Sequence, residues 1–144
     1  MENAQVSRVR GEHVAFKRLL WSTPLAAVAA AVANAVVYFV ASALGAMPQD
    51  FVVQGSGPIT LAPVVISSLI GAAGAAVVFA VVALLSRRPI RTFRIVAAGV
   101  LVLSFATPLT IPGAPLSMIL TLELMHVVAA VIITGMLTTF ARAK

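Results

Sequence analysis

The chain has 144 residues, of which 61% are hydrophobic and 10% are charged. Soluble domains are about half apolar and about a quarter charged, so this chain carries more apolar surface than a soluble fold of its size can bury. Its net charge of +6 does not indicate nucleic-acid binding, because the basic residues flank the apolar runs. The absence of cysteine excludes disulfides, thiolate catalysis and zinc–thiolate sites.

The N-terminal part of the chain predicts a short tail followed by a membrane span. Residues 1–17 are polar, and we interpret them as a cytoplasmic tail. The first apolar run, at about 19–44, starts beside Lys17, Arg18 and Trp21, which are residue types that gather at membrane interfaces. The run is longer than the apolar part of a signal peptide, so we expect it to be retained as a transmembrane helix.

Three further apolar runs predict three more spans. The second lies at about 59–85, after a Gly- and Pro-rich stretch expected to be turn and coil. The third, at about 94–111, is the shortest, and the fourth lies at 116–140. Since a helix needs about 20 apolar residues to cross the bilayer, residues 18–140 predict a four-transmembrane-helix domain, followed by a cytoplasmic tail at 141–144. The expected fold class is all-α: an integral membrane four-helix bundle with up-down-up-down topology.

The basic residues predict the orientation of this bundle. All ten lie in the N-terminal tail, at the turn after the second span, or in the C-terminal tail. With four spans these segments share one side, and the positive-inside rule makes that side the cytoplasm. We therefore expect a multi-pass protein of the bacterial cytoplasmic (inner) membrane with both termini in the cytoplasm. The turn carries Arg87, Arg88, Arg91 and Arg94, a topology signal whose charges also suit anionic lipid headgroups.

Helix packing in lipid depends on close contact and hydrogen bonds, so small and polar stripes predict the buried faces. The first span has a stripe of Ala27, Ala30 or Ala31, Asn34, Tyr38, Ala41 or Ser42, and Gly45. Its opposite face is bulky and is expected to contact lipid: Leu25, Val28, Val32, Val36, Phe39 and Val40. The second span offers Ser67, Gly71 and Ala75, and the fourth offers His126, Ala130, Thr134 and Thr138.

Polar side chains concentrate in the half of the bundle away from the basic segments. Asn34 and His126 each lie about ten residues, or roughly 15 Å, from the outer edge of their spans, which places both near the midplane. Tyr38 and Glu123 lie roughly 10 Å from that edge by the same rise per residue. We therefore predict an outward-facing polar pocket formed by Asn34, Tyr38, Ser67, Ser104, Glu123 and His126.

Several uses of this polar cluster remain open from the sequence. It fits a structural hydrogen-bond network, or a pocket for a ligand or transported solute with Glu123 and His126 as proton-coupled groups. Glu123 either pairs with an imidazolium at His126 or stays neutral because its apolar surroundings disfavour the charged form. Glu123-x-x-His126 has the spacing of di-iron carboxylate bundles, but such a site needs a second copy of the motif and further carboxylates. Haem ligation by His126 has no partner in the chain, because His13 lies in the cytoplasmic tail.

The chain resembles a family of small four-span bacterial membrane proteins of unknown function, frequent in high-GC Gram-positive genomes. The resemblance covers roughly residues 18–140 and implies four membrane helices, with no activity, substrate or cofactor. The stretches that carry it are Arg18-Leu19-Leu20-Trp21, Ala33-Asn34-Ala35-Val36-Val37-Tyr38, Gly57-Pro58-Ile59-Thr60-Leu61, Pro108-Leu109-Thr110 with Pro112-Gly113-Ala114-Pro115, and Leu124-Met125-His126-Val127-Val128-Ala129-Ala130.

The sequence holds no recognisable catalytic constellation, so we expect a non-enzymatic accessory or ligand-binding subunit without a cofactor or resident metal. The alternative is a small oligomeric proton-coupled transporter that uses Glu123 and His126, and a metal- or haem-binding membrane protein comes third. The expected partners are the lipid bilayer and either a second copy of the chain or another membrane protein.

Overall fold

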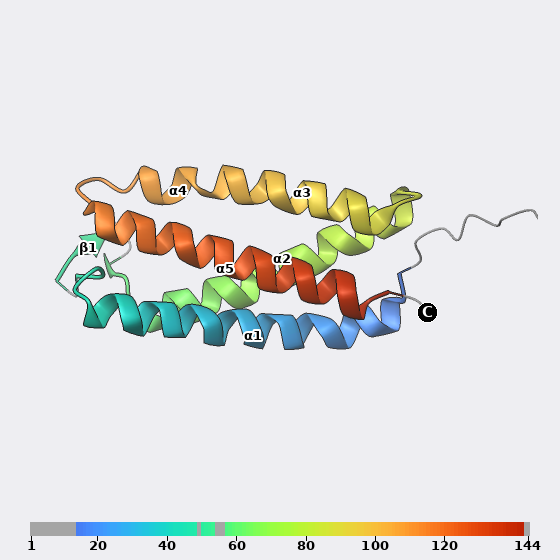
Figure 1. Cartoon of the computed structure of the whole chain (residues 1–144), viewed down its shortest axis with the longest axis horizontal. Coiled ribbons are helices and arrows are strands. Elements are labelled where there is room, and N and C mark those ends of the chain that lie inside the picture. Colours follow the sequence, from blue (N-terminus) through green and yellow to red (C-terminus); the bar gives the residue numbers. More distant parts are fainter. Residues whose placement is uncertain (1–13, 49, 54–56, 143–144) are drawn as a thin grey trace, which may run out of the picture.

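The computed structural model describes residues 14–48, 50–53 and 57–142. Its first helix, α1 (Phe16–Ala43), begins three residues before the predicted span and accommodates Pro24 within its first turns (Figure 1). Gly45 follows with a φ of 71°, a left-handed conformation that costs glycine little and that turns the chain out of the helix.

A short hairpin connects α1 to the second helix. Strands β1 (Val52–Val53) and β2 (Gly57–Pro58) pair antiparallel, with Val52 opposite Pro58. The sequence predicts only turn and coil in this stretch, so the strand pair is an addition to that prediction. Helix α2 (Leu61–Leu85) then starts two residues after the predicted position and ends where the basic turn begins.

The third span differs most from the prediction. Helix α3 (Pro89–Ser104) begins five residues before the predicted start at residue 94, because Pro89 occupies the first helical position, where a missing N–H costs nothing. A break at Phe105 separates it from the short helix α4 (Ala106–Leu109). Together they give a continuous candidate span, Pro89–Leu109, of 21 residues, so the span is not too short to cross a bilayer. Helix α5 (Leu116–Phe140) matches the predicted fourth span.

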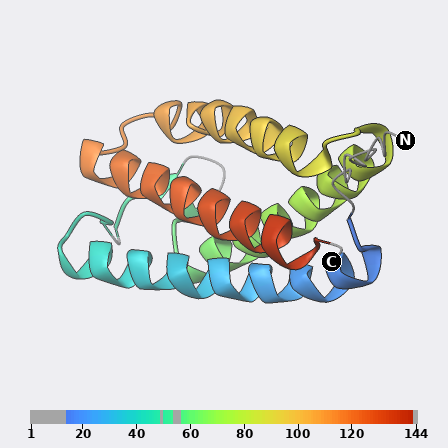
Figure 2. The same ribbon diagram turned by 45° about the vertical axis from the view of Figure 1, so that its right-hand side comes forward.

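The helices run alternately up and down along one long axis (Figures 1 and 2). Helix α1 packs against α2 and α5, whereas α3 contacts α2, α5 and α4 but not α1. In Figure 1, α2 runs obliquely, lying beside α1 near the hairpin and beside α3 at the opposite end. The expected all-α four-helix bundle is confirmed: over the described residues, four helical segments are long and apolar enough to cross a membrane. The chain is a multi-pass membrane protein.

The packed face of α1 is the small-residue stripe that the sequence predicts. Ala27, Ala30, Asn34, Tyr38 and Ala41 of the predicted stripe are buried along it, together with Ala26. The prediction is wrong for Gly45, which lies after the end of the helix and is exposed. The bulky opposite face is exposed on the outside of the bundle, as lipid contact requires: Leu25, Val28, Val32, Val36, Phe39 and Val40. Small residues let neighbouring helix backbones approach closely, which is the main source of helix association in lipid.

The predicted faces of the other two helices are partly wrong. The buried residues of α2 are Val64, Ser68, Ala72 and Phe79. The first three are shifted by one position from the predicted stripe, whereas Phe79 continues its four-residue spacing. Ser67 and Gly71, which the sequence placed in a packed face, are exposed. On α5, the buried set is Met118, Thr121, Met125, Ile133, Leu137 and Thr138, so only Thr138 of the predicted stripe is fully packed.

Two apolar clusters form the core, one toward each end of the bundle. The cluster near the chain ends contains Leu19, Phe79, Phe93 and Leu137, with Phe79 and Phe93 stacked at 4.5 Å between ring centroids. The cluster near the hairpin is centred on Tyr38, Val64, Met118 and Met125, together with Met47 from the loop after α1. The space between these clusters contains the site described below.

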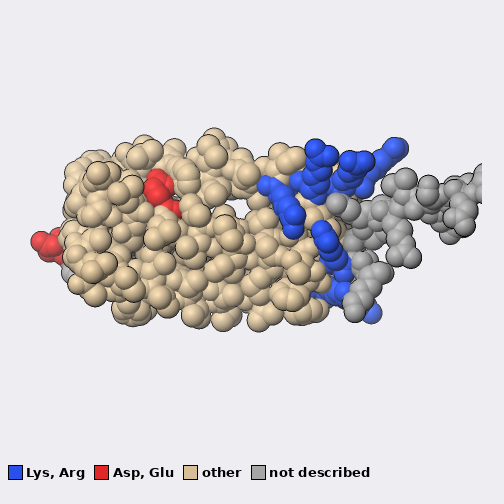
Figure 3. Space-filling model, in the orientation of Figure 1, with Lys and Arg blue, Asp and Glu red and all other residues tan. Residues whose placement is uncertain are grey.

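The basic residues lie at one end of the bundle. The described Lys and Arg side chains gather at the end where the described chain begins at Val14 and stops at Arg142 (Figure 3): Lys17, Arg18, Arg87, Arg88, Arg91, Arg94 and Arg142. Asp50 belongs to the loop at the hairpin end. The first and last turns are bonded to each other there, since the Ala15 N–H donates to the Ala141 carbonyl at 2.8 Å and Arg18 Nη1 donates to the Arg142 carbonyl at 2.9 Å. Arg8, Arg10 and Lys144 lie outside the described residues.

Candidate functional site

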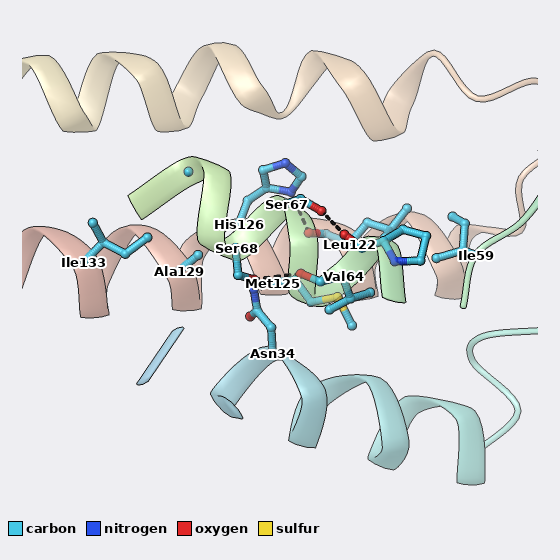
Figure 4. Close-up of a pocket in the computed structure, with 12 residues that line it drawn as sticks. Asn34, Ile59, Val64, Ser67, Ser68, Leu122, Met125, His126, Ala129 and Ile133 are labelled. Carbon is cyan, nitrogen blue, oxygen red and sulfur yellow. Dashed lines mark hydrogen bonds between the residues drawn. The ribbon is translucent and has the colours of Figure 1, made fainter. Parts of the chain in front are cut away.

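A cavity of about 440 Å³ lies between α1, α2 and α5, in the middle of the bundle and toward the hairpin (Figure 4). Its volume falls within the range of small-molecule sites in proteins. We call it the polar cavity, because three polar residue types interrupt an otherwise apolar wall. Its lining consists of Asn34, Ile59, Pro63, Val64, Ser67, Ser68, Gly71, Leu122, Met125, His126, Ala129 and Ile133.

Asn34 supplies an unsatisfied acceptor in this cavity. Its side chain is 5% exposed, and its Nδ2 donates to Ser68 Oγ at 3.1 Å. The Ser68 hydroxyl in turn donates to the Val64 carbonyl at 2.8 Å, so Ser68 is satisfied as both donor and acceptor. Asn34 Oδ1 is buried and has no hydrogen-bond partner among the described residues. A buried amide oxygen left in this way costs about 1–3 kcal/mol, unless a ligand or water supplies a donor.

His126 forms the opposite wall, with its ring on the side of α3 (Figure 4). Its Nδ1 lies 2.7 Å from the Leu122 carbonyl of the preceding turn. Because a carbonyl only accepts, Nδ1 carries the proton, and Nε2 is the nitrogen left to interact with a ligand. Within the described segments Nε2 makes no hydrogen bond. Ser67 lies on α2 near His126, with its hydroxyl bonded to the Pro63 carbonyl.

A second cavity of about 310 Å³ adjoins the first, between α2, α3 and α5. We call it the tail groove. An opening between α3 and α5 is visible beside this region in the space-filling view (Figure 3). The tail groove shares Gly71, His126, Ala129 and Ile133 with the polar cavity. Its remaining lining is almost entirely apolar: Gly74, Ala75, Val78, Phe93, Val96, Ala97, Val100, Leu101, Ser104, Ala130 and Thr134.

Four of the six predicted site residues line these cavities. Asn34, Ser67 and His126 meet in the polar cavity, while Ser104 lies in the tail groove with its hydroxyl donating to the Leu101 carbonyl at 2.7 Å. Ser68 lies outside the predicted set, although it is the hydrogen-bond partner of Asn34. The sequence predicts that a serine of α2 contributes to the site. The buried face of α2 is shifted by one residue, however, so Ser68 and not Ser67 turns toward α1.

Tyr38 and Glu123 line neither cavity. Tyr38 packs in the apolar cluster near the hairpin, and its hydroxyl donates to the Ile59 carbonyl at 3.4 Å. Both carboxyl oxygens of Glu123 are buried, and neither has a hydrogen-bond partner in the described part of the chain. The structure therefore contains no Glu123–His126 ion pair, which was one of the two arrangements left open by the sequence.

The apolar cluster near the chain ends closes the inner side of both cavities. Phe79 and Phe93 are buried at 0% and 1% exposure, and Phe93 itself forms part of the tail-groove wall. Their stacked rings lie between the cavities and the basic end of the bundle. The site is therefore a pocket that ends inside the bundle.

One comparison with known proteins identifies the family. A family of unknown function (DUF6069) matches residues 15–143 of the chain. The chain belongs to the DUF6069 family. No curated protein and no solved structure matches it. The resemblance to a four-span family of unknown function is thereby confirmed.

The function of the DUF6069 family is unknown, so membership indicates no activity or ligand for this protein. Over the described residues, no three His, Asp or Glu side chains come together as metal ligands would. His13, the second histidine, lies outside the described residues. The polar residues that line the polar cavity carry an amide, an imidazole and two hydroxyls, which together suit the binding of an uncharged polar group.

Proposed function

We propose that this protein is a non-enzymatic membrane subunit that binds a small uncharged ligand in the polar cavity. The observation that carries the proposal is Asn34, which lines a cavity of about 440 Å³ and whose Oδ1 is a buried acceptor with no partner among the described residues. A ligand that donates a hydrogen bond to this oxygen removes the cost of leaving it unsatisfied. Most of the lining is apolar, so the rest of the ligand is apolar as well.

We further propose that both termini lie in the cytoplasm and that the protein resides in the cell membrane. The concentration of described basic residues at the end where α1 begins and α5 ends supports this orientation, because Lys and Arg are retained on the cytoplasmic side during insertion. The hairpin end then faces outward. The polar cavity in this orientation lies in the outer half of the membrane, so ligands arrive from the outer leaflet.

Binding of octan-1-ol, a small alcohol with an apolar body, tests the proposal. We expect a saturable rise in the unfolding temperature of the detergent-purified protein, because a ligand that binds only the folded state stabilises it by mass action. Ala129→Phe places a large ring where both cavities meet and is expected to abolish the rise. Leu124→Phe is the matched control, because Leu124 is 51% exposed on the outer face of the same helix.

The two variants separate binding from a general effect of alcohol on the micelle. The proposal requires that Leu124→Phe responds as the unmodified protein does while Ala129→Phe does not respond. An equal rise in all three proteins, or none in the unmodified protein, contradicts a ligand site at this position.

A proton-coupled transporter is the second candidate. Two observations favour it: His126 lines both cavities, and the two buried carboxyl oxygens of Glu123 have no partner in the part of the chain that the structure describes. Buried ionisable residues in membrane helices often mark proton paths. The stacked Phe79–Phe93 pair argues against a path through one protomer, so this function requires an oligomer or a second conformation. A proton flux into liposomes that Glu123→Gln and His126→Ala both abolish would support the transporter, and the absence of flux would leave the binding role.

A further inference from the structure

We propose that the ligand is a long-chain alcohol whose hydroxyl occupies the polar cavity and whose hydrocarbon chain occupies the tail groove. The inference rests on the proposed binding function and names the chemical class of the ligand. It follows from three features: the two cavities adjoin, the groove is lined by small residues, and neither cavity is lined by a permanently charged side chain.

The two cavities lie next to each other, and one is partly polar whereas the other is almost entirely apolar. Four residues line both of them, and these residues come from α2 and α5. On α2 the combined lining runs from Pro63 to Val78, which is roughly 22 Å at the helical rise per residue. Asn34 and Ser67 occur only in the polar cavity, whereas Val78, Phe93 and Val96 occur only in the groove. A ligand that fills this space is an amphiphile.

Small residues line the groove at a place where two helices diverge. Small side chains on facing membrane helices normally let the helices close on each other. In this bundle, α2 diverges from α3 toward the hairpin (Figure 1), so Gly71 and Gly74 remain exposed. No heavy atom lies within 4 Å of the point where a Cβ would stand at either glycine. The small residues of α2 therefore border a space for a chain, and Ala97 and Ala130 border it from the other helices.

The polar cavity selects an uncharged donor. Neither lining set contains Lys, Arg, Asp or Glu, so an ionic headgroup finds no counter-charge at this depth, where an unpaired charge is costly. Asn34 Oδ1 is an acceptor, which excludes a head that only accepts, such as an ether or a ketone. A hydroxyl has one hydrogen to donate, and both Asn34 Oδ1 and the unprotonated His126 Nε2 are acceptors that can receive it.

The apolar chain adds selectivity mainly through its fit to the groove. The bilayer dissolves a hydrocarbon chain as well as the groove does, so transfer alone favours neither. The groove gains from contacts along the chain, and the Phe79–Phe93 stack limits how far the chain extends. The hydroxyl also contributes, because the apolar membrane interior offers it few acceptors and Asn34 Oδ1 has no other partner among the described residues.

A comparison of four probes in the same detergent tests the assignment: octan-1-ol, hexadecan-1-ol, hexadecyl methyl ether and hexadecyl phosphate. We measure the saturable rise in unfolding temperature against the mole fraction of each probe in the micelle. We expect hexadecan-1-ol to bind about fivefold more tightly than octan-1-ol and than the ether, the factor that corresponds to about 1 kcal/mol. We expect no saturable binding of the phosphate.

Gly74→Leu separates the groove from the polar cavity, because Gly74 lines only the groove and has open space for a side chain. It is expected to reduce binding of hexadecan-1-ol to the level of octan-1-ol and to leave octan-1-ol unaffected. Val77→Leu, at a position that is 64% exposed on the same helix, is the control. Ala97→Leu fills the groove from α3 and replaces Gly74→Leu if that variant does not fold.

The outcomes distinguish the inference from the proposed function. If octan-1-ol binds but the longer alcohol gains nothing, or keeps its advantage in Gly74→Leu, the chain does not use the groove and the inference is overturned while the binding function stands. Equal binding of the ether and the alcohol overturns the role of the hydroxyl. If no alcohol binds, the proposed function and the inference fail together.

Discussion

Replacing Asn34 with leucine tests whether the polar residues hold the bundle together or serve a ligand. Leucine has a similar size and no polar atom. The substitution removes the hydrogen bond from Nδ2 to Ser68 Oγ, and such bonds in membrane bundles average about 0.6 kcal/mol. It also removes the buried, unpartnered Oδ1, which costs about 1–3 kcal/mol. Ser68 keeps its bond to the Val64 carbonyl, so no new unsatisfied group appears.

The balance predicts that Asn34→Leu leaves the free energy of unfolding unchanged or raises it by up to about 2 kcal/mol. Ser68→Ala is the matched comparison, because it leaves Asn34 Nδ2 as well as Oδ1 without a partner. We expect it to lower the free energy of unfolding by about 1–3 kcal/mol. Reversible unfolding in mixed detergent and SDS micelles, monitored by circular dichroism, measures both changes.

The reverse order of stabilities would refute this reasoning. If Asn34→Leu loses more stability than Ser68→Ala, the amide makes structural contacts that outweigh the cost of its free oxygen. The polar cluster would then be a hydrogen-bond network that fixes helix register, and the argument for a ligand at Asn34 Oδ1 would be lost.

Three further predictions concern other parts of the bundle. Phe79→Ala removes a fully buried ring stacked on Phe93 and is expected to cost roughly 3–5 kcal/mol in the same unfolding assay; a loss below about 1 kcal/mol would mean that the inner cluster is not tightly packed. Glu123→Leu removes a carboxyl group without a partner among the described residues, so the unfolding midpoint should stay constant or rise, whereas a large fall would reveal a missed ion pair. The chain has no native cysteine, so Thr110→Cys and Arg87→Cys report topology: an impermeant maleimide applied to intact cells should label only the first, and labelling of the second alone would invert the proposed orientation.

The sequence predicts the number and type of helices well, because apolar length and composition alone decide which segments can cross a bilayer. The small stripe of α1 is also confirmed, since this helix contacts two neighbours and its bulky and small faces are clearly separated. The sequence places the start of α3 too late, at about 94, because basic residues interrupt the apolar run before that position. Long basic side chains reach the interface from within the first turns of a span, so the helix can begin before them.

The polar site was predicted in part. Matching depths correctly brought Asn34 and His126 to one cavity, because depth follows directly from counting residues along a helix. Depth does not determine the rotation of a helix about its axis, and this rotation put Ser68 in place of Ser67 against α1 and kept Glu123 out of both linings. The cavities themselves follow from the oblique course of α2, which no local pattern in the sequence indicates.

The backbone bond between Ala15 and Ala141 has a practical consequence for protein engineering. It places the two ends of the folded domain side by side, so a few added residues between Val14 and Arg142 would close the polypeptide into a ring. New ends could then be opened in the turn at 110–115, outside every helix. Such a circular permutant would have its ends at the opposite end of the bundle and would keep each helix covalently intact.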